Sequence, residues 1–242
     1  MKLMIIRHAD PDYSVDGLTE TGKKEAALLS RRMKDVPAAA YYCSPLGRAR
    51  MTAQAVLDAV GRTAETRDWL QEFAIFPQDG VDLPARNVWD HLPTVYTEDP
   101  LLSTPRWYDS PVFEGYAARE RYEWVCRGLD ELLAAHGYRR ACPERQIYRA
   151  ERSNHDTVVL FCHFGLECML LGHLLGVSPV LLAQGTMAAP SSVTTLVTEE
   201  RVEGTAVFRC LSFGDVTHLL AAGETPSFAG RFCECFTDDT RR

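Results

Sequence analysis

The hydrophobic pattern of the chain predicts an α/β fold with a mostly parallel central sheet. Residues 3–6 and 158–162 are unbroken apolar runs of strand length. Such runs are typical of parallel strands with helices on both faces, because neither face of the strand meets water. Residues 38–43 form a third candidate strand, and stretches with helical apolar spacing lie between and after the three strands. We therefore expect a three-layer sandwich, with the sheet in the middle and helices on both faces.

Capping residues predict where several helices begin and end. Thr19 is expected to cap a helix that runs to about residue 34, and Ser44, followed by Pro45, to cap the next one. Gly61 and Gly176 suit the left-handed position just beyond a helix end. These signals place helices after the predicted strands.

The remaining segments complete the expected architecture. Residues 73–112 are irregular, aromatic and proline-rich, and they are too long for a simple connection, so we expect an inserted lid over the strand ends. A helix is expected from about residue 114 to 136, and the polar stretch 139–156 is expected to be a loop. Residues 193–198 and 205–213 predict a hairpin at the sheet edge. We expect residues 1–242 to form one domain with this insertion.

Basic residues follow all three predicted strands. Arg7 and His8 come directly after the first, His163 follows another, and Arg48 lies one turn into the helix after the third. In a parallel sheet the carboxyl ends of the strands share one edge, and ligands bind there. We therefore expect these four side chains to form one site.

Two arginines and two histidines suit a phosphate group. Guanidinium and imidazole groups can neutralise a phosphate dianion and donate hydrogen bonds to its oxygens. A histidine nitrogen can also attack phosphorus and form a covalent phosphohistidine. A carboxyl group is then needed to protonate the leaving oxygen and to activate water.

Composition narrows the class of protein. The 242 residues carry a net charge of −7 without a cluster of Lys and Arg, which argues against a nucleic-acid partner. We see neither a secretion signal nor an apolar stretch long enough to cross a membrane. The eight cysteines are therefore expected to be reduced thiols in the cytoplasm, with little prospect of a metal at Cys233 and Cys235.

Four motifs, in the right order, resemble the histidine phosphatase superfamily, also called phosphoglycerate mutase-like. The first resembles the Arg-His-Gly signature of that family, with alanine in place of glycine, and the second resembles its Leu-Thr-Glu-x-Gly helix start. The third is similar to its second-arginine motif and the fourth to its second-histidine motif. The motifs are Arg7-His8-Ala9, Leu18-Thr19-Glu20-Thr21-Gly22, residues 44–53 (SPLGRARMTA) and Cys162-His163-Phe164-Gly165.

The resemblance implies roles for individual residues. His8 would be the nucleophile, with Arg7, Arg48 and His163 forming the phosphate pocket. Glu72 lies where the family often carries its proton donor. The other carboxyls that could serve are Asp10, Asp12, Asp79, Asp82 and Glu114. Ser14 would replace a polar phosphate contact that the family has after its first histidine.

The expected function is a metal-independent phosphomonoesterase without a cofactor, which hydrolyses a small phosphorylated metabolite and releases phosphate. The first alternative is a phosphoglycerate mutase-like isomerase, which returns the phosphoryl group to a substrate. The second is a metal hydrolase using His8, Asp10, Asp12 and His163, although a metal site would not explain Arg7 and Arg48. The third is a phospho-ligand binder without catalysis. The oligomeric state is not predicted.

Overall fold

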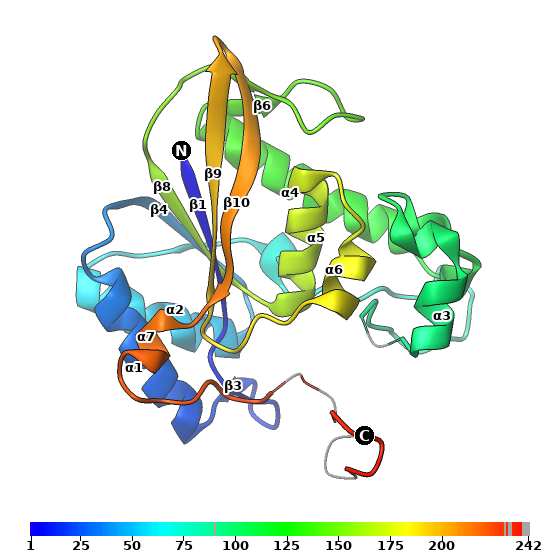
Figure 1. Ribbon diagram of the computed structural model, residues 1–242, viewed down its shortest axis with the longest axis horizontal. Helices are drawn as coiled ribbons and strands as arrows, with labels where there is room; N and C mark the ends of the chain where they lie inside the picture. The colour runs from blue at the N-terminus through cyan, green and yellow to red at the C-terminus, as the bar shows by residue number, and fades with distance from the viewer. Residues whose placement is uncertain (90, 230, 232–233, 239–242) are drawn as a thin grey trace.

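A central sheet organises the computed structural model, which describes residues 1–89, 91–229, 231 and 234–238. Its strands are β1 (Lys2–Arg7), β4 (Ala38–Cys43), β5 (Glu65–Thr66), β6 (Tyr138–Arg140), β7 (Tyr148–Ala150), β8 (Thr157–Cys162), β9 (Val193–Val202) and β10 (Thr205–Asp215). They lie side by side in the order β5-β4-β8-β1-β9-β10-β7-β6 (Figure 1). A separate ladder joins β2 (Pro11–Asp12) to β3 (Gly17–Leu18).

The sheet is mostly but not entirely parallel. The neighbouring strands β5, β4, β8 and β1 pair in parallel, and the remaining neighbours pair antiparallel. As a result β9 and β7 run against the other described strands of this sheet. The predicted α/β class and its mostly parallel sheet are confirmed.

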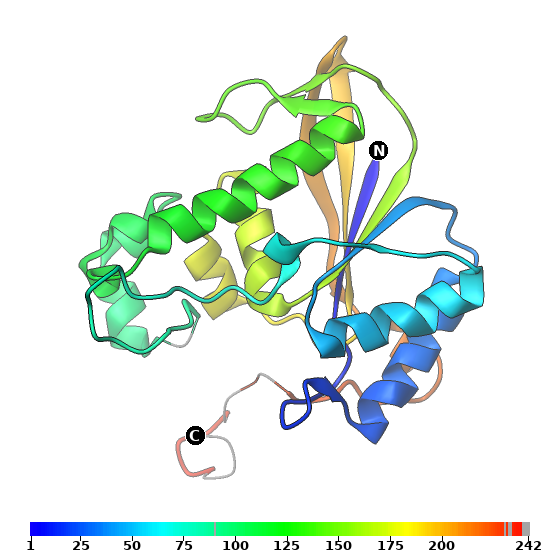
Figure 2. The ribbon, with the colours of Figure 1, turned by 180° about the vertical axis from the view of Figure 1, so that it is seen from behind.

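Helices cover both faces of the sheet (Figures 1 and 2). The helices α1 (Glu20–Met33), α2 (Gly47–Val60) and α7 (Thr217–Leu220) lie on one side, and α4 (Ala118–Ala135), α5 (Phe164–Leu175) and α6 (Pro179–Gly185) on the other. Strand β1 shows why its sequence is continuously apolar. Leu3 and Ile5 enter the core under α4 and α5, whereas Met4 and Ile6 enter the core under α1 and α2. Each such side chain contributes roughly 1.5–3 kcal/mol by burial.

The helix boundaries confirm most of the capping signals. The Thr19 hydroxyl accepts from the Gly22 amide at 3.0 Å, and Gly61 and Gly176 take left-handed backbone angles, with φ of 62° and 71°. The predicted cap at Ser44 is wrong, because α2 begins at Gly47. The Ser44 hydroxyl instead contacts a histidine at the end of a neighbouring strand.

Three further expectations are corrected. The helix expected from residue 114 begins at Ala118, since Gly115 takes a left-handed φ of 81° that interrupts a helix. The stretch 139–156 is not a simple loop, because β6 and β7 pair within it. The hairpin β9–β10 forms as expected but lies inside the sheet, where β7 covers its outer strand and β1 its inner one.

The predicted insertion is folded rather than irregular. Within residues 73–112 lie α3 (Pro93–Glu98) and the 3-10 turns Pro100–Ser103 and Trp107–Asp109, with a further turn at Pro111–Phe113. Trp107 is fully buried, and its ring packs edge-on against Phe73, Phe113 and Tyr122 of α4. This aromatic cluster attaches the segment to α4, on the side of the molecule away from α1 (Figure 1). Its function as a lid stays a prediction.

A C-terminal arm, residues 221–229, runs back along α1 to the loop that follows β1 (Figures 1 and 2). The buried Glu25 carboxylate accepts from the amides of Asp10, at 2.8 Å, and Ser227, at 3.3 Å. The Ser227 hydroxyl also donates to the Asp10 carboxylate, and Lys24 pairs with Glu224 at 2.6 Å. Glu25 thus joins the arm to the loop beyond β1.

This arrangement predicts a pH dependence of stability. Burial raises the pKa of Glu25 to about 7 against 4.5 for a free side chain, so the folded state holds its proton more tightly than the unfolded state does. The stabilisation is complete below about pH 4.5 and is lost as the pH rises through 7. We expect the wild-type protein to lose roughly 1–3 kcal/mol relative to Glu25→Gln between pH 4.5 and 8, measured by urea unfolding. The exposed Glu20→Gln is the matched control, and parallel curves for wild type and Glu25→Gln would contradict the prediction.

Candidate active site

The carboxyl ends of β4, β8 and β1 lie next to one another and bring the predicted site together. Arg7 is in register with Cys162, and the His8 amide donates to the Cys162 carbonyl at 2.9 Å. The rings of His8 and His163 are consequently 5.1 Å apart between centroids. Two residues that are far apart in the sequence become neighbours because β1 and β8 pair in parallel.

His8 is buried and held in one tautomer. Its Nδ1 lies 2.8 Å from the backbone carbonyl of Ala9. Since a carbonyl can only accept, Nδ1 carries the proton and Nε2 keeps a free lone pair. Burial, together with the charge of Arg7, lowers the pKa of His8 to about 3. The imidazole is therefore neutral at physiological pH, as a nucleophilic nitrogen must be.

His163 is fully buried and follows β8 directly. Its Nε2 lies 2.8 Å from the Ser44 hydroxyl, and its Nδ1 has no hydrogen-bond partner among the described residues. Burial and the neighbouring His8 hold the pKa of His163 well below its usual range. If the Ser44 hydroxyl donates to Nε2, Nδ1 carries the proton and is a free donor. A buried donor without a partner is costly unless a ligand satisfies it.

The two arginines are fixed by contacts that leave donors free. Arg7 is buried, donates through Nη1 to the Ala188 carbonyl and lies 5.6 Å from the Phe164 ring centre. Arg48 pairs through Nη1 with Asp16 at 2.6 Å. The Nε atoms of both arginines are buried without a partner in the described part of the chain. Both guanidinium groups thus retain donors for an anion.

Asp16 is a site residue that sequence reasoning missed. Its carboxylate accepts from the Gly47 amide and from Arg48, each at 2.6 Å, and so ties the loop after β1 to the start of α2. Partial burial acts to raise the pKa of Asp16, but the hydrogen bonds from Gly47 and Arg48 prevail and lower it. Asp16 is therefore an ionised orienting group. A lone aspartate in a polar loop carries no sequence signal for this role.

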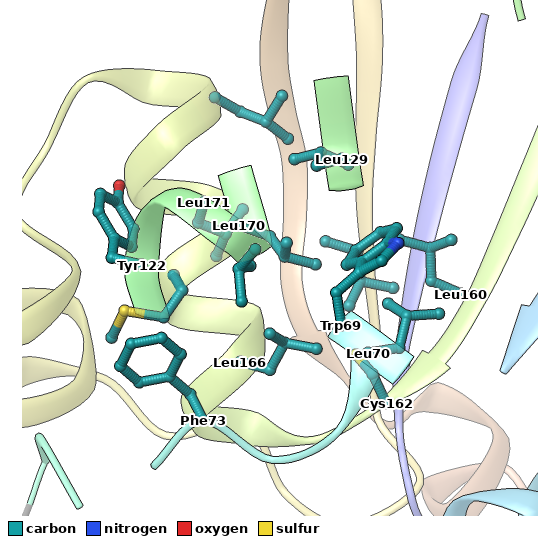
Figure 3. Packing of buried hydrophobic residues seen from close by; sticks show 14 of the residues in the cluster. Trp69, Leu70, Phe73, Tyr122, Leu129, Leu160, Cys162, Leu166, Leu170 and Leu171 are labelled. Atoms are coloured by element: carbon teal, nitrogen blue, oxygen red, sulfur yellow. The ribbon is translucent and has the colours of Figure 1, made fainter. Parts of the chain in front are cut away.

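Glu72 is positioned by the apolar residues before it. Trp69 and Leu70 lie in the 3-10 turn Asp68–Leu70 and pack toward Leu160 of β8 (Figure 3). The chain that leaves this turn carries the Glu72 carboxyl to the start of α5, where Oε1 accepts from the Leu166 amide at 3.0 Å. The Phe73 amide donates to the same oxygen at 2.8 Å.

The chemistry of Glu72 follows from this place. Burial raises its pKa against the opposing effects of the two amides and of Arg7 and Arg48. A raised pKa favours a carboxyl that can give a proton near neutral pH. A Cβ at Gly165 would approach the Glu72 Oε1 to 2.8 Å and the Trp89 ring to 2.2 Å. Glycine at this position is thus required by the close approach of both side chains.

A comparison with known protein families identifies the family of the chain. The sequence profile of the histidine phosphatase superfamily (branch 1) matches residues 3–208, most of the chain. The protein belongs to the histidine phosphatase superfamily. The resemblance of its motifs is thereby confirmed, and no curated protein sequence matches the chain significantly.

Solved structures of similar fold agree with this superfamily. A mutant phosphoserine phosphatase from Entamoeba histolytica, in complex with phosphoserine, superposes with a TM-score of 0.61 at 17% identity, covering 90% of this chain and 98% of that one. A mycobacterial glucosyl-3-phosphoglycerate phosphatase gives 0.59 at 19% identity, covering 88% and 98%. Bacillus stearothermophilus YhfR gives 0.54 at 22% identity, covering 90% and 98%. At these identities the likeness shows the fold.

The other carboxyls considered from the sequence are placed differently in this superfamily member. Asp79, Asp82 and Glu114 are exposed, and Asp10 is bound by Thr19 and Ser227. Glu72 is the sequence-predicted candidate that interacts with both Arg7 and Arg48. Its role as proton donor stays a prediction.

Ser14 lies in the exposed part of the loop after β1. Its hydroxyl donates to the Asp12 carboxylate at 2.6 Å, and its amide donates to the same oxygen at 3.0 Å. Neighbouring Tyr13 lies over Arg48, with 5.3 Å from the guanidinium carbon to the ring centre. Ser14 is thus near the loop that carries Asp16 but is engaged by Asp12, and its phosphate contact stays a prediction.

Two further features bear on the alternatives. In the described ranges, no three or more His, Cys, Asp or Glu side chains are arranged to hold a metal ion, so His8, Asp10, Asp12 and His163 do not form such a group. No helix in that part of the chain is long and apolar enough to cross a membrane. Cys233 lies outside the described residues, so the pair Cys233 and Cys235 is not tested.

Proposed function

We propose that the protein is a phosphomonoesterase that transfers the phosphoryl group of a small phosphorylated metabolite to His8 and then to water. The observation that carries the proposal is the neutral His8 ring, whose free Nε2 lies in a site with Arg7, Arg48 and His163. This arrangement supplies a nucleophile and a set of donors for the phosphoryl oxygens. It needs neither a metal ion nor a cofactor.

In the first step the Nε2 lone pair of His8 forms a bond to phosphorus while the bond from phosphorus to the leaving oxygen breaks. The free donors of Arg7, Arg48 and His163 stabilise charge on the three phosphoryl oxygens. Glu72 gives its proton to the leaving oxygen, which departs as an alcohol. The enzyme then holds phosphohistidine and an ionised Glu72.

In the second step the Glu72 carboxylate takes a proton from water while the water oxygen attacks phosphorus. The bond from phosphorus to Nε2 breaks, and its electron pair returns to His8. Inorganic phosphate leaves, and Glu72 is protonated again for the next cycle. Ser44 supports both steps, since its hydroxyl lies 2.8 Å from Nε2 of His163 and fixes that ring.

The substrate class rests on similar proteins. The solved structures of similar fold include a phosphoserine phosphatase with phosphoserine or with 3-phosphoglyceric acid, and a mycobacterial phosphatase with inorganic phosphate. Small phosphate monoesters of this kind are the first substrates to test. We also propose a cytoplasmic location, supported by the seven described cysteines, which are all free thiols. Thiol alkylation in intact cells would test the location.

A substrate screen combined with Glu72→Gln tests the proposed function. The wild-type protein is expected to release phosphate from phosphoserine and p-nitrophenyl phosphate in the presence of a chelator. Glu72→Gln is expected to slow phosphoserine hydrolysis about 10²–10⁴-fold. It should lower kcat/KM for the aryl ester much less, because kcat/KM reports transfer of the phosphoryl group to His8 and p-nitrophenolate leaves without a proton. The exposed Asp79→Asn is the matched control.

Two results would refute the proposal. One is isomerisation of 3-phosphoglycerate without net phosphate release, which would identify a mutase. The other is tight phosphate binding without turnover of any ester, which would identify a binding protein. An equal loss of kcat/KM for both esters in Glu72→Gln would refute the role of Glu72 as proton donor alone.

A further inference from the structure

A buried carboxyl outside the proposed mechanism lies on the helix that follows His163. Glu167 is in the first turn of α5, four residues after His163, and is 1% exposed. Neither of its carboxyl oxygens has a hydrogen-bond partner of good geometry in the described part of the chain. The mechanism above does not use this residue. A buried carboxylate without a partner is costly, so its presence calls for a reason.

The charged, polar and titratable neighbours of Glu167 come from several elements. Its charged neighbours are Arg7 of β1 and Glu72. The Thr194 hydroxyl of β9 is its polar neighbour; Thr194 Oγ1 already accepts from the Gly214 amide, so its proton is available. The remaining titratable neighbours are three thiols, whose pKa values burial raises, so that they stay neutral: Cys162, Cys168 and Cys210.

The charges around Arg7 do not balance when all groups are ionised. The Arg7 guanidinium then faces Glu72, Glu167, Glu25 and the phosphate dianion of the substrate. Arg48 also acts on Glu72, but Arg48 is already paired with Asp16. Carboxyls that share a site do not ionise independently, because the first negative charge disfavours the second. Glu72 accepts from two backbone amides, whereas Glu167 has only the Thr194 hydroxyl nearby. Burial raises the pKa of Glu167 to about 7, so its charge changes in the physiological range.

We propose that Glu167 is a positioning residue whose charge, acting on Arg7, sets the strength with which Arg7 binds phosphate as the pH rises. The inference rests on the proposed function. Glu72, which accepts from two amides, ionises first, and its negative charge makes loss of the Glu167 proton harder. When Glu167 ionises in turn, its charge offsets part of the positive charge of Arg7 and weakens the binding of phosphate.

The first test measures phosphate affinity, which requires no turnover. Inorganic phosphate is titrated calorimetrically into wild type and Glu167→Gln at pH 5.5 and pH 8. At pH 8 the variant is expected to bind phosphate several-fold more tightly, up to roughly tenfold, because it lacks the charge beside Arg7. At pH 5.5, where Glu167 is protonated, the two affinities should agree. Equal affinities at both pH values would overturn the proposal.

The second test follows inhibition by inorganic phosphate during turnover of p-nitrophenyl phosphate. The inhibition constant of the wild type should rise between pH 5.5 and pH 8, and that of Glu167→Gln should rise several-fold less. Glu167→Asp keeps the charge and should restore the wild-type pH dependence. A loss of rate without a change in the pH dependence of inhibition would indicate a structural role and overturn the proposal.

Controls separate this inference from the proposed function. Glutamine matches glutamate in size and removes a buried charge, and Glu167→Leu provides a second uncharged variant that should give the same shifts. If a His8→Ala variant keeps full activity, the proposed function fails regardless of Glu167. If activity requires His8 but neither the affinity for phosphate nor inhibition by phosphate responds to loss of the Glu167 charge, only this inference fails.

Discussion

Replacement of His8 by alanine is expected to lower phosphate release by at least about a thousandfold. The reason is that Nε2 of His8 is the group to which the phosphoryl group is transferred. Two other histidines are engaged elsewhere: His163 contacts Ser44 through Nε2, and His218 contacts Ser191 at 3.1 Å. The measurement is phosphate release from phosphoserine by wild type and variant at matched concentrations.

A trapping experiment gives the same prediction a second readout. Rapid quenching with labelled substrate should leave acid-labile, base-stable label on wild type and none on His8→Ala. His155→Ala is the matched control. His155 is exposed and lies just before the amino end of β8, whereas the site lies at its carboxyl end. Persistent label on His8→Ala, or equal losses in both variants, would show that another residue accepts the phosphoryl group.

Replacement of Arg48 by methionine is expected to lower kcat/KM about 10²–10³-fold. Arg48 carries a free Nε donor at the start of α2, and the Arg48 side chain is 11% exposed. Loss of Arg48 removes a positive charge that stabilises the phosphoryl oxygens in both steps. The variant should fold, because the Asp16 that it leaves unpaired is 43% exposed and can be hydrated.

Arg50→Met is the matched control for Arg48, since it lies two residues further along the same helix and is exposed. The Arg50 variant should retain wild-type kinetics, and inorganic phosphate should inhibit the Arg48 variant much more weakly than the wild type. Comparable losses in the two variants would show that general positive charge, rather than a contact from Arg48, supports activity. Melting temperatures within a few degrees of wild type would exclude unfolding as the cause.

Local sequence patterns predicted much of the fold. The unbroken apolar run before Arg7 predicted a strand buried on both faces, and its alternate side chains do enter two different cores. Thr19 and Gly176 marked helix ends correctly, because their capping chemistry acts within a few residues. Ser44 is not the cap, because α2 begins only at Gly47; its hydroxyl accepts from the Leu46 amide and also contacts His163, more than a hundred residues away.

The sequence alone predicted which residues lie at the strand ends. A run of apolar residues followed by Arg7 and His8 indicates a buried strand that ends in basic side chains, and this pattern is local. Only the tertiary structure decided the partners of these residues. The place of Glu72 at the start of α5, the pairing of Asp16 with Arg48, and the buried Glu167 beside Arg7 all join distant segments. Burial and charge act through space between distant segments, so no local sequence pattern predicts these contacts.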